Sequence, residues 1–330
     1  MPKRSGMKAV MEAMRAHRRF MVSSHINPEG DALGSAIALA SLLKRMGKHA
    51  VLATTGGIPA AFDYLPRLVP VFSRPDPRIK AEVSMIVDVP ALERVGSMEP
   101  LIRRTPLVVC VDHHVSNQLF ADVNWVEPKA AAVGEMIYEL YKAFRIKPSR
   151  EEAYCMYVSL VTDTGSFKYM NTTPKVHRLA AELIARGISP LEISQHLYES
   201  RSASDLRFLG FLLRSIRVTA GGKIAWLEVP CAAVKKFSAG VEILDELVNF
   251  PRSVETAEIA FVLKESTKEK GVVRVSFRSK GRVDVDQLAR VFGGGGHMAA
   301  SGCTMRDTTL AGARLKVLRA AREALTKQKR

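Results

Sequence analysis

Carboxylates and histidines gather at four places along this chain, each where an apolar segment ends. They are His25, Glu29, Asp31, Asp88, Asp112, His113, His114 and Asp163. Mixed carboxylate and imidazole donors suit divalent ions such as manganese. Two such ions roughly 3.5–4 Å apart can activate water and stabilise both the attacking and the leaving oxygen in a displacement at phosphorus. If the fold brings the four places together, these residue types predict a two-metal centre for phosphoester hydrolysis.

Each place by itself also has a plain structural interpretation. Asp112, His113 and His114 could form a polar loop after a strand, because metal binding and catalysis are only one use of histidine. Asp31 could cap the helix that follows it, but capping does not explain why His25 and Glu29 share its loop. So many acids converging without a cation would repel one another and shift their pKa values strongly. The combination therefore favours metal binding.

Short apolar segments would carry these groups to one edge of a sheet. Residues 107–111 are Leu-Val-Val-Cys-Val, which is typical of a strand buried on both faces. In a parallel sheet, ligands bind at the carboxyl ends of the strands, where these acids and histidines stand. Further strands are expected at 20–24, 49–53 and 82–87, and helices at 7–17, 32–46, 130–144 and 151–161. This alternation predicts an α/β fold with a doubly wound, mainly parallel sheet.

The last third of the chain has a different pattern, which predicts a second, smaller α/β domain containing a mixed sheet. Its strand segments are 216–219, 223–229, 256–264 and 272–279, followed by helices at 285–292 and 310–327. Alternation places Arg274, Ser276 and Arg278 on one strand face. The two arginines there could hold a phosphate or could simply face solvent.

A run of four glycines, residues 293–296, precedes His297. We expect a helix to start just after this run, so that the backbone N–H groups of Gly294, Gly295 and Gly296 can approach an anion closely. Flexible linkers are also rich in glycine, but His297 and the small residues after it argue against a linker.

Charge and length narrow the class of protein. The formal net charge of +16 would attract polyanions such as nucleic acids, although many basic surfaces are only solvated. Phe167 and Tyr169 could stack on bases, with packing in the core an equal alternative for Phe167. At 330 residues the chain is long enough for about two domains. We expect domains at 1–190 and 215–330, joined by a helical linker at 191–214.

Cysteine use and hydropathy favour a cytoplasmic protein. The four cysteines form no close-spaced pairs, which argues against a disulfide framework or a thiolate zinc site. No apolar run approaches the ~20 residues of a membrane helix, and no secretory signal follows the basic N-terminus. We therefore expect no membrane association, and a homodimer only as the commonest soluble assembly.

The motifs resemble those of the DHH phosphoesterase superfamily in order and in approximate spacing. The matching segments are His25-x-Asn27-Pro28-Glu29-Gly30-Asp31-Ala32, Asp88, Asp112-His113-His114 and Thr162-Asp163-Thr164-Gly165. Residues 275–279, 283–285 and 293–302 are similar to the substrate-binding domain that accompanies the DHH domain. Over residues 7–325 the chain most resembles nanoRNases of the NrnA type, also called oligoribonuclease and pAp phosphatases.

The resemblance implies two divalent ions, usually manganese, with magnesium or cobalt as alternatives. One ion would be held by His25, Glu29 and Asp88, and the other by Asp31, Asp88, His113 and Asp163, so that Asp88 bridges. His114 would contact the substrate phosphate, and Asp112 would support the cluster. Family members usually carry Asp where this chain has Glu29, so the carboxylate is kept with one more methylene.

In the second domain the resemblance implies that Arg278, Ser279 and His297 hold the phosphate and terminal nucleotide of the substrate. The glycines Gly294, Gly295 and Gly296 would line the same pocket. We add Arg274 because it shares a strand face with Arg278.

The expected activity is manganese-dependent cleavage of di- to pentaribonucleotides, including pGpG, to nucleoside 5′-monophosphates, with removal of the 3′-phosphate of pAp as a further activity. A RecJ-like exonuclease acting on single-stranded DNA is an alternative, although the 330 residues hold no added oligonucleotide-binding domain. A catalytically inactive nucleotide-binding regulator is a third interpretation, and Glu29 is the one feature in its favour.

Overall fold

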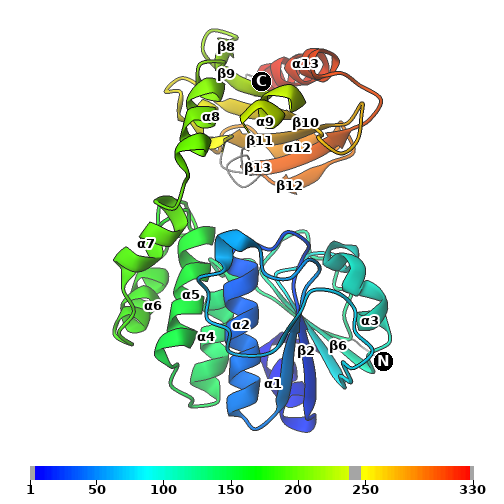
Figure 1. Cartoon of the computed structure of the whole chain (residues 1–330), viewed down its shortest axis with the longest axis vertical. Coiled ribbons are helices and arrows are strands. Elements are labelled where there is room, and N and C mark those ends of the chain that lie inside the picture. The colour runs from blue at the N-terminus through cyan, green and yellow to red at the C-terminus, as the bar shows by residue number, and fades with distance from the viewer. Residues whose placement is uncertain (1–3, 238–246, 328–330) are drawn as a thin grey trace. The chain divides into compact units, whose positions relative to one another are not determined.

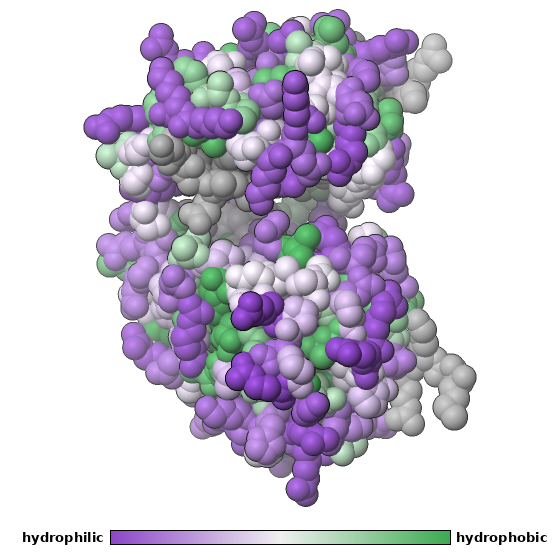
Figure 2. All heavy atoms as spheres, turned by 45° about the vertical axis from the view of Figure 1, so that its right-hand side comes forward, coloured by the Kyte–Doolittle hydropathy of each residue, from purple (hydrophilic) through white to green (hydrophobic). Residues whose placement is uncertain are grey.

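The computed structural model describes residues 4–237 and 247–327 (Figure 1). The chain divides into two compact units, Met1–Glu199 and Ser200–Arg330. Each unit has its own sheet and its own hydrophobic core, so each is described by itself. Hydrophilic side chains cover most of the face drawn in Figure 2, with apolar residues in small groups between them. In the described part of the chain, no helix has the length and apolar character needed to span a bilayer.

The described residues of the first unit form a seven-stranded sheet in the order β1-β7-β6-β5-β2-β3-β4. The strands are β1 (Arg4–Ser5), β2 (Arg19–Ser23), β3 (His49–Ala53), β4 (Val71–Phe72), β5 (Val83–Val87), β6 (Leu107–Asp112) and β7 (Val123–Val126). Every pairing in it is parallel. The sequence predicted β2, β3, β5 and β6 but not the other three, which are too short for a clear periodicity.

Helices cover both faces of this sheet, which confirms the doubly wound α/β fold. The described helices of this unit are α1 (Gly6–Ala16), α2 (Gly30–Arg45), α3 (Glu99–Arg103), α4 (Val133–Ala143), α5 (Arg150–Asp163), α6 (Pro174–Ile184) and α7 (Pro190–Tyr198), with 3-10 turns η1 (Ala60–Phe62) and η2 (Leu92–Met98). Phe20 and Val22 of β2 join the core under α1, α2, α4 and α5. Met21 joins the opposite core with η2 and α3. Figure 1 shows α2, α4 and α5 side by side on one face.

Two glycines let α2, α4 and α5 approach one another closely, near the edge of the sheet at which the predicted metal ligands stand. A Cβ on Gly34 of α2 would lie 2.2 Å from the carbonyl oxygen of Cys155 in α5. A Cβ on Gly134 of α4 would lie 2.1 Å from Oγ of Ser159 in α5. Any larger residue would force the helices apart, so both glycines are required for this packing.

The described residues of the second unit form a six-stranded sheet in the order β12-β13-β11-β10-β9-β8. The sheet is mixed, as predicted, but strands β12 and β13 were not predicted. The strands are β8 (Arg217–Thr219), β9 (Ile224–Val229), β10 (Ile259–Glu265), β11 (Val273–Ser279), β12 (Gly295–His297) and β13 (Ala300–Met305). The β9–β10 pair is parallel, and the other pairs are antiparallel. The helices are α8 (Ala203–Leu213), α9 (Cys231–Phe237), α11 (Asn249–Ser253), α12 (Val285–Arg290) and α13 (Leu310–Lys327).

The glycine run does not precede a helix, so that prediction was wrong. Residues Gly295–His297 form strand β12, which pairs antiparallel with β13. A Cβ on Gly294 would lie 2.2 Å from the Gly302 carbonyl oxygen, and one on Gly296 would lie 2.6 Å from that of Ala300. The glycines are therefore needed because two backbones meet closely in a tight hairpin.

Candidate metal centre and substrate-binding face

Three neighbouring parallel strands, β6, β5 and β2, end at the same edge of the first sheet. His25 follows β2, Asp88 follows β5 directly, and Asp112 is the last residue of β6, ahead of His113 and His114. Two helices bring the remaining acids to this edge. Asp31 lies in the first turn of α2, and Asp163 is the last residue of α5.

These acids and histidines form one cluster, and His113 lies at its centre. Among the described residues, two groups have ligand atoms within 4.8 Å of one another. These groups are Asp88 with His113 and His114, and Asp31 with His113 and Asp163. The Nε2 atom of His113 lies 3.8 Å from Asp31 Oδ2, 3.7 Å from Asp88 Oδ1 and 3.5 Å from Asp163 Oδ2.

The histidine rings are oriented by backbone carbonyl groups. Nδ1 of His113 donates to the Ala130 oxygen at 3.0 Å, because a carbonyl oxygen can only accept. Nδ1 of His25 donates in the same way to the Ile26 oxygen at 2.8 Å, and its Nε2 lies 3.5 Å from Asp88 Oδ2. Both Nε2 atoms therefore face carboxylates, and in the neutral ring Nε2 carries the lone pair that binds a cation, which is the usual arrangement of a metal-binding histidine.

Asp31 is held by the beginning of α4 and by α5. Its carboxylate accepts from the Val133 N–H at 2.8 Å and the Gly134 N–H at 3.2 Å. It also accepts from Ser159 Oγ at 2.6 Å. The N-terminal end of a helix favours a negative charge, and these three hydrogen bonds hold the buried Asp31 side chain in place. Ser159 was missed in the sequence, because nothing there distinguishes it from the other residues of a largely buried helix.

Asp88 has a left-handed backbone with φ of 58°. Such a conformation is unfavourable for a residue with a Cβ and persists where the surroundings hold it, commonly at functional sites. The Asp88 N–H donates to the Val111 oxygen of β6 at 3.1 Å, which fixes the turn. The buried carboxylate is thereby directed at the three histidines rather than along the strand.

Asp112, His114 and Asn117 form a hydrogen-bonded chain beside the cluster. Nδ1 of His114 donates to Asp112 Oδ1 at 2.7 Å, and Asn117 Nδ2 donates to Asp112 Oδ2 at 2.6 Å. Burial raises the pKa of Asp112, but these hydrogen bonds outweigh burial and hold it below its usual value. Burial lowers the pKa of His114, but the hydrogen bond to Asp112 and the charge of Asp88 raise it above its usual value. Asn117, which follows the motif by three residues, was missed in the sequence.

The cluster carries an excess of negative charge. Burial, and then the charge of Asp31, raise the pKa of Asp88 well above its usual value and that of Asp163 to about 7. Burial lowers the pKa of His113, but the three carboxylates raise it to about 9. In the described part of the chain, the ion pairs of Asp31, Asp88 and Asp163 are all with histidines. This donor set fits divalent cations, which would relieve the repulsion.

Glu29 lies at the margin of this arrangement. It is exposed at the N-cap of α2, where its side chain makes no capping hydrogen bond. Neither ligand group contains it, and His25 is likewise outside both groups. Its charge is close enough to contribute to the raised pKa of Asp163.

On the second sheet, burial alternates along β11, so that Arg274, Ser276 and Arg278 share the face away from the adjoining core. Arg278 pairs with Ala300 of β13, which pairs with His297 of β12. Directly paired residues point to the same face, so Arg278 and His297 flank the small Ala300. In the next row, Ser276 pairs with Gly302, and Gly302 with Gly295. On β11, β13 and β12 the residues of this face are exposed or half-buried and include two arginines, whereas on β10 the same face is covered by the core that contains Val262.

Ser279 differs from its neighbours on β11. It is buried, and by alternation it points to the opposite side of the strand from Arg278. Its Oγ accepts from the Gly281 N–H at 3.3 Å, so it shapes the turn after β11.

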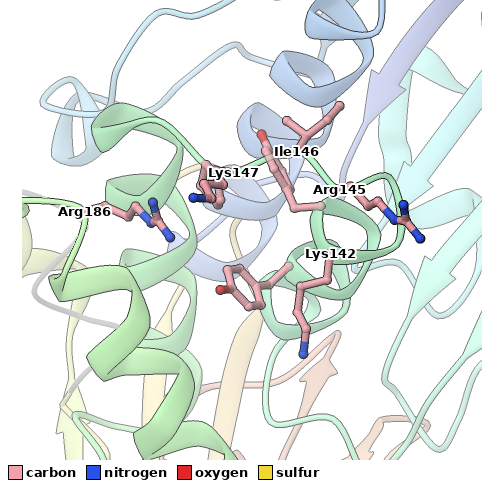
Figure 3. Close-up of a pocket in the computed structure, with 8 residues that line it drawn as sticks. Lys142, Arg145, Ile146, Lys147 and Arg186 are labelled. Atoms are coloured by element: carbon pink, nitrogen blue, oxygen red, sulfur yellow. The ribbon is translucent and has the colours of Figure 1, made fainter.

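A cavity of about 240 Å³ lies elsewhere in the first unit (Figure 3). It is lined by Tyr138, Tyr141, Lys142, Arg145, Ile146, Lys147, Pro148 and Arg186. It adjoins the last turn of α4 and the segment before α5, whereas Asp31 contacts the first turn of α4 and Asp163 ends α5. The cations near the ends of α4 and α6 complement the negative C-terminal ends of those helices. The cavity is therefore separate from the metal cluster.

Comparison with known proteins agrees with this geometry. The DHH family N-terminal domain matches residues 19–160, and the DHHA1 domain matches residues 227–327. A bifunctional oligoribonuclease and PAP phosphatase NrnA from Thermus thermophilus is 31% identical over 326 residues, which cover 97% of this chain and 95% of the relative. The chain belongs to the DHH family. The resemblance found in the sequence is thus confirmed.

Two further DHH-family comparisons extend over most of the chain. The NrnA protein of the same description from Bacillus subtilis is 29% identical over 289 residues, covering 85% of this chain and 87% of the relative. The crystal structure of an exopolyphosphatase-related protein from Bacteroides fragilis matches with a TM-score of 0.87 and 25% identity. That match covers 98% of this chain and 96% of the other.

Proposed function

We propose that this protein is a manganese-dependent phosphodiesterase that degrades di- to pentaribonucleotides, including pGpG, to nucleoside 5′-monophosphates. We further propose that it removes the 3′-phosphate of pAp. As a DHH-family member it is a hydrolase acting on phosphoester bonds. The observation that carries the proposal is the convergence of three carboxylates on His113 Nε2 at the carboxyl edge of a parallel sheet. The names of the two NrnA relatives support the substrate class.

We assign the metal ligands as the family resemblance implies, with Asp88 shared between the two ions. Its Oδ2 faces His25 and its Oδ1 faces His113. We assign one ion to His25, Glu29 and Asp88, and the other to Asp31, Asp88, His113 and Asp163. Two divalent ions supply an activated water and charge neutralisation at phosphorus when they are bound. The Ala130 and Ile26 carbonyl groups keep the Nε2 atoms of His113 and His25 directed at the cluster. Hydrogen bonds from α4 and Ser159 hold the Asp31 carboxylate in position for the same purpose.

His114 is assigned to the substrate. Its Nδ1–H donates to Asp112, and its raised pKa favours the protonated ring. A protonated imidazole beside Asp88 can donate a charge-assisted hydrogen bond to a phosphate oxygen and offset charge that develops there. Asp112 and Asn117 orient this ring and are positioning residues.

The basic face of the second sheet is assigned to the non-reacting part of the substrate. Arg278 and His297, with the small Ala300 between them, offer donors to a phosphate, and Arg274 extends the charge along β11. Gly294, Gly295 and Gly296 have no side chains, so a nucleotide can lie directly against the backbone at this edge of the face. The buried Ser279 would act through the turn that it holds.

A substrate-length series with product identification tests the proposal. Purified protein with Mn²⁺ should convert labelled di- to pentaribonucleotides to nucleoside 5′-monophosphates and should release phosphate from pAp. Long single-stranded DNA should be a poor substrate, whereas faster turnover of long strands would indicate an exonuclease of the RecJ type. Failure to hydrolyse any short RNA, pGpG or pAp with Mn²⁺, Mg²⁺ or Co²⁺ would refute the proposed activity.

A further inference from the structure

The segment that follows Asp163 has an unusual and well-fixed backbone. Gly165, Ser166 and Phe167 are three successive residues with φ of 57°, 60° and 61°. A left-handed conformation at two non-glycine residues is unfavourable and persists only when the surrounding structure enforces it. The N–H groups of Lys168 and Tyr169 both donate to the Thr164 oxygen at 3.0 Å. The loop is therefore held in one shape beside a residue of the metal cluster.

Asn171 ties the far end of this loop back to the cluster. Its Nδ2 donates to the backbone carbonyl oxygen of Asp163 at 3.0 Å and to that of Ala131 at 3.0 Å. Ala131 adjoins Ala130, whose carbonyl group orients His113. The position of the loop is thus fixed relative to two residues of the cluster, Asp163 and His113.

The loop exposes one aromatic ring and packs the other, which is half-buried, against the core. A Cβ on Gly165 would lie 2.3, 2.5 and 2.6 Å from Cζ, Cε2 and Cε1 of Tyr169, which places the glycine against a face of that ring. Tyr169 is nevertheless 39% exposed. Phe167 instead packs on the first core, with its ring near those of Tyr157 and His177. Of the two aromatic residues considered in the sequence, only Tyr169 is accessible to a ligand.

Other apolar side chains are exposed on the loops that carry the cluster. Ile26 follows His25, Val115 follows His114, and Met170 follows Tyr169. They are 38%, 78% and 92% exposed, respectively. Exposed apolar groups beside a concentrated polar site indicate a ligand with both characters. A nucleotide is such a ligand, because its phosphate suits the cluster and its base offers a flat apolar face.

We propose that the ring of Tyr169 stacks on a nucleobase of the substrate next to the phosphate that is hydrolysed. This inference rests on the proposed function and specifies its nucleoside subsite. Stacking on a ring accepts every base, since each has a π-face, so the subsite is tolerant of sequence. Gly165 is required because any side chain there would displace the ring. The backbone of the loop pre-organises the ring, so little freedom is lost on binding.

Base-dependent kinetics distinguish stacking from a structural role. The substrates are a dinucleotide and two versions of it in which one or the other base is replaced by an abasic residue. Y169A should lower kcat/KM for the intact dinucleotide about 10- to 100-fold. For the abasic version that lacks the stacked base, wild type and Y169A should be equal within about twofold. Y169F keeps the ring and should resemble wild type, whereas Y169L keeps apolar bulk on Gly165 and should resemble Y169A.

Leu191→Ala is the matched control, because Leu191 is 65% exposed on α7, outside the loops of the cluster. It should leave every rate unchanged. Equal losses for Y169A on all three substrates would overturn stacking in favour of a structural role. No loss for Y169A on the intact dinucleotide would overturn it as well.

A binding measurement separates this inference from the proposed function. A dinucleotide containing 2-aminopurine, added without divalent metal, should lose fluorescence on binding to wild type and Y169F but not to Y169A. If wild type hydrolyses none of the substrates, the proposed function fails while quenching can still occur. Hydrolysis without any ring-dependent quenching would overturn the inference and leave the proposed function standing.

Discussion

The metal cluster and the glycine hairpin are both made of residues that stand out in the sequence, but different physics holds them in place. The cluster brings together residues from five separate segments at the ends of β2, β5 and β6 and of α2 and α5. The hairpin brings together residues of two neighbouring strands, β12 and β13. The cluster is constrained by charge, whereas the hairpin is constrained by steric fit.

This difference shows which features point to a ligand. Carboxylates that raise one another's pKa values remain together only at a cost in stability, and a bound cation removes that cost. Glycines that allow two backbones to meet require no ligand to explain them. The cluster is therefore evidence for chemistry by itself, while the hairpin becomes evidence only through Arg278 and His297 beside it.

The largest effect is expected from removing the carboxylate that contacts all three histidines. Asp88→Asn should lower kcat with Mn²⁺ by about 10³-fold or more, because metal-dependent stabilisation at phosphorus is worth several kcal/mol. Steady-state kinetics on a dinucleotide, with metal content measured on the same samples, provides the test. Asp63→Asn is the control, since Asp63 is exposed and pairs with Arg67. Turnover by Asp88→Asn within tenfold of wild type would contradict the assigned role of Asp88.

The hairpin should respond through stability. Gly294→Ala places a Cβ 2.2 Å from a backbone oxygen and should destabilise the second unit by roughly 1–3 kcal/mol. The control is Gly210→Ala in α8, where the added methyl meets nothing within 4 Å and helix propensity predicts stabilisation of up to about 1 kcal/mol. Denaturant unfolding of both variants compares them. Equal stability of Gly294→Ala and wild type would mean that the hairpin adapts readily.

The contrast also explains what the sequence could reveal. The doubly wound sheet, the mixed sheet and the motif residues could be predicted because apolar segments of five or more residues end abruptly in polar residues. Strands β1, β4 and β7 are not visible, because segments of two to four residues have no periodicity of their own and form by pairing with neighbours. The prediction of a helix after Gly296 was wrong, because a tight hairpin requires flexible glycines just as a phosphate-binding loop does.

The residues that support the cluster could not be predicted from the sequence, for another reason. Ser159 and Asn117 are ordinary polar residues whose importance comes only from what they contact, namely Asp31 and Asp112. No spacing rule marks such contacts before the fold is known. The roles carried over to Glu29, His25 and Ser279 remain predictions that the variants above can be extended to test.

A smaller effect is expected from the chain that orients His114. Asp112→Asn removes the charge that raises the pKa of His114, so that pKa should fall. If protonated His114 contacts the phosphate, activity is lost as pH rises through its pKa. The alkaline limb of the kcat profile should therefore move to lower pH. Asn117→Ala should lower kcat about 10- to 100-fold, as expected for residues that orient a site. An unshifted alkaline limb in Asp112→Asn would argue against His114 as the donor.

The smallest effect should be seen in the stability of the metal-free protein. Asp163 has a folded pKa of about 7, above the usual value of an aspartate, so between about pH 4 and 7 the folded state binds more protons than the unfolded state. The contribution of Asp163 to stability should therefore fall as pH rises through this window and stay level above it. Asp163→Asn lacks this dependence, so the variant should gain on wild type from pH 4 to 7. The gain should be modest, because the Asp163 side chain is 35% exposed and solvent screens its charge.

Denaturant unfolding in a chelator, at intervals from pH 4 to 8, measures the difference between wild type and Asp163→Asn. Saturating Mn²⁺ should reverse the sign of this stability difference. The ionised carboxylate of Asp163 then has a cation to bind, whereas the variant has no carboxylate at that position. A difference that stays constant with pH in chelator would show that the cluster is not strained by its own charge. Gly294→Ala neither adds nor removes a titratable group, so it should differ from wild type by the same amount at every pH in this range.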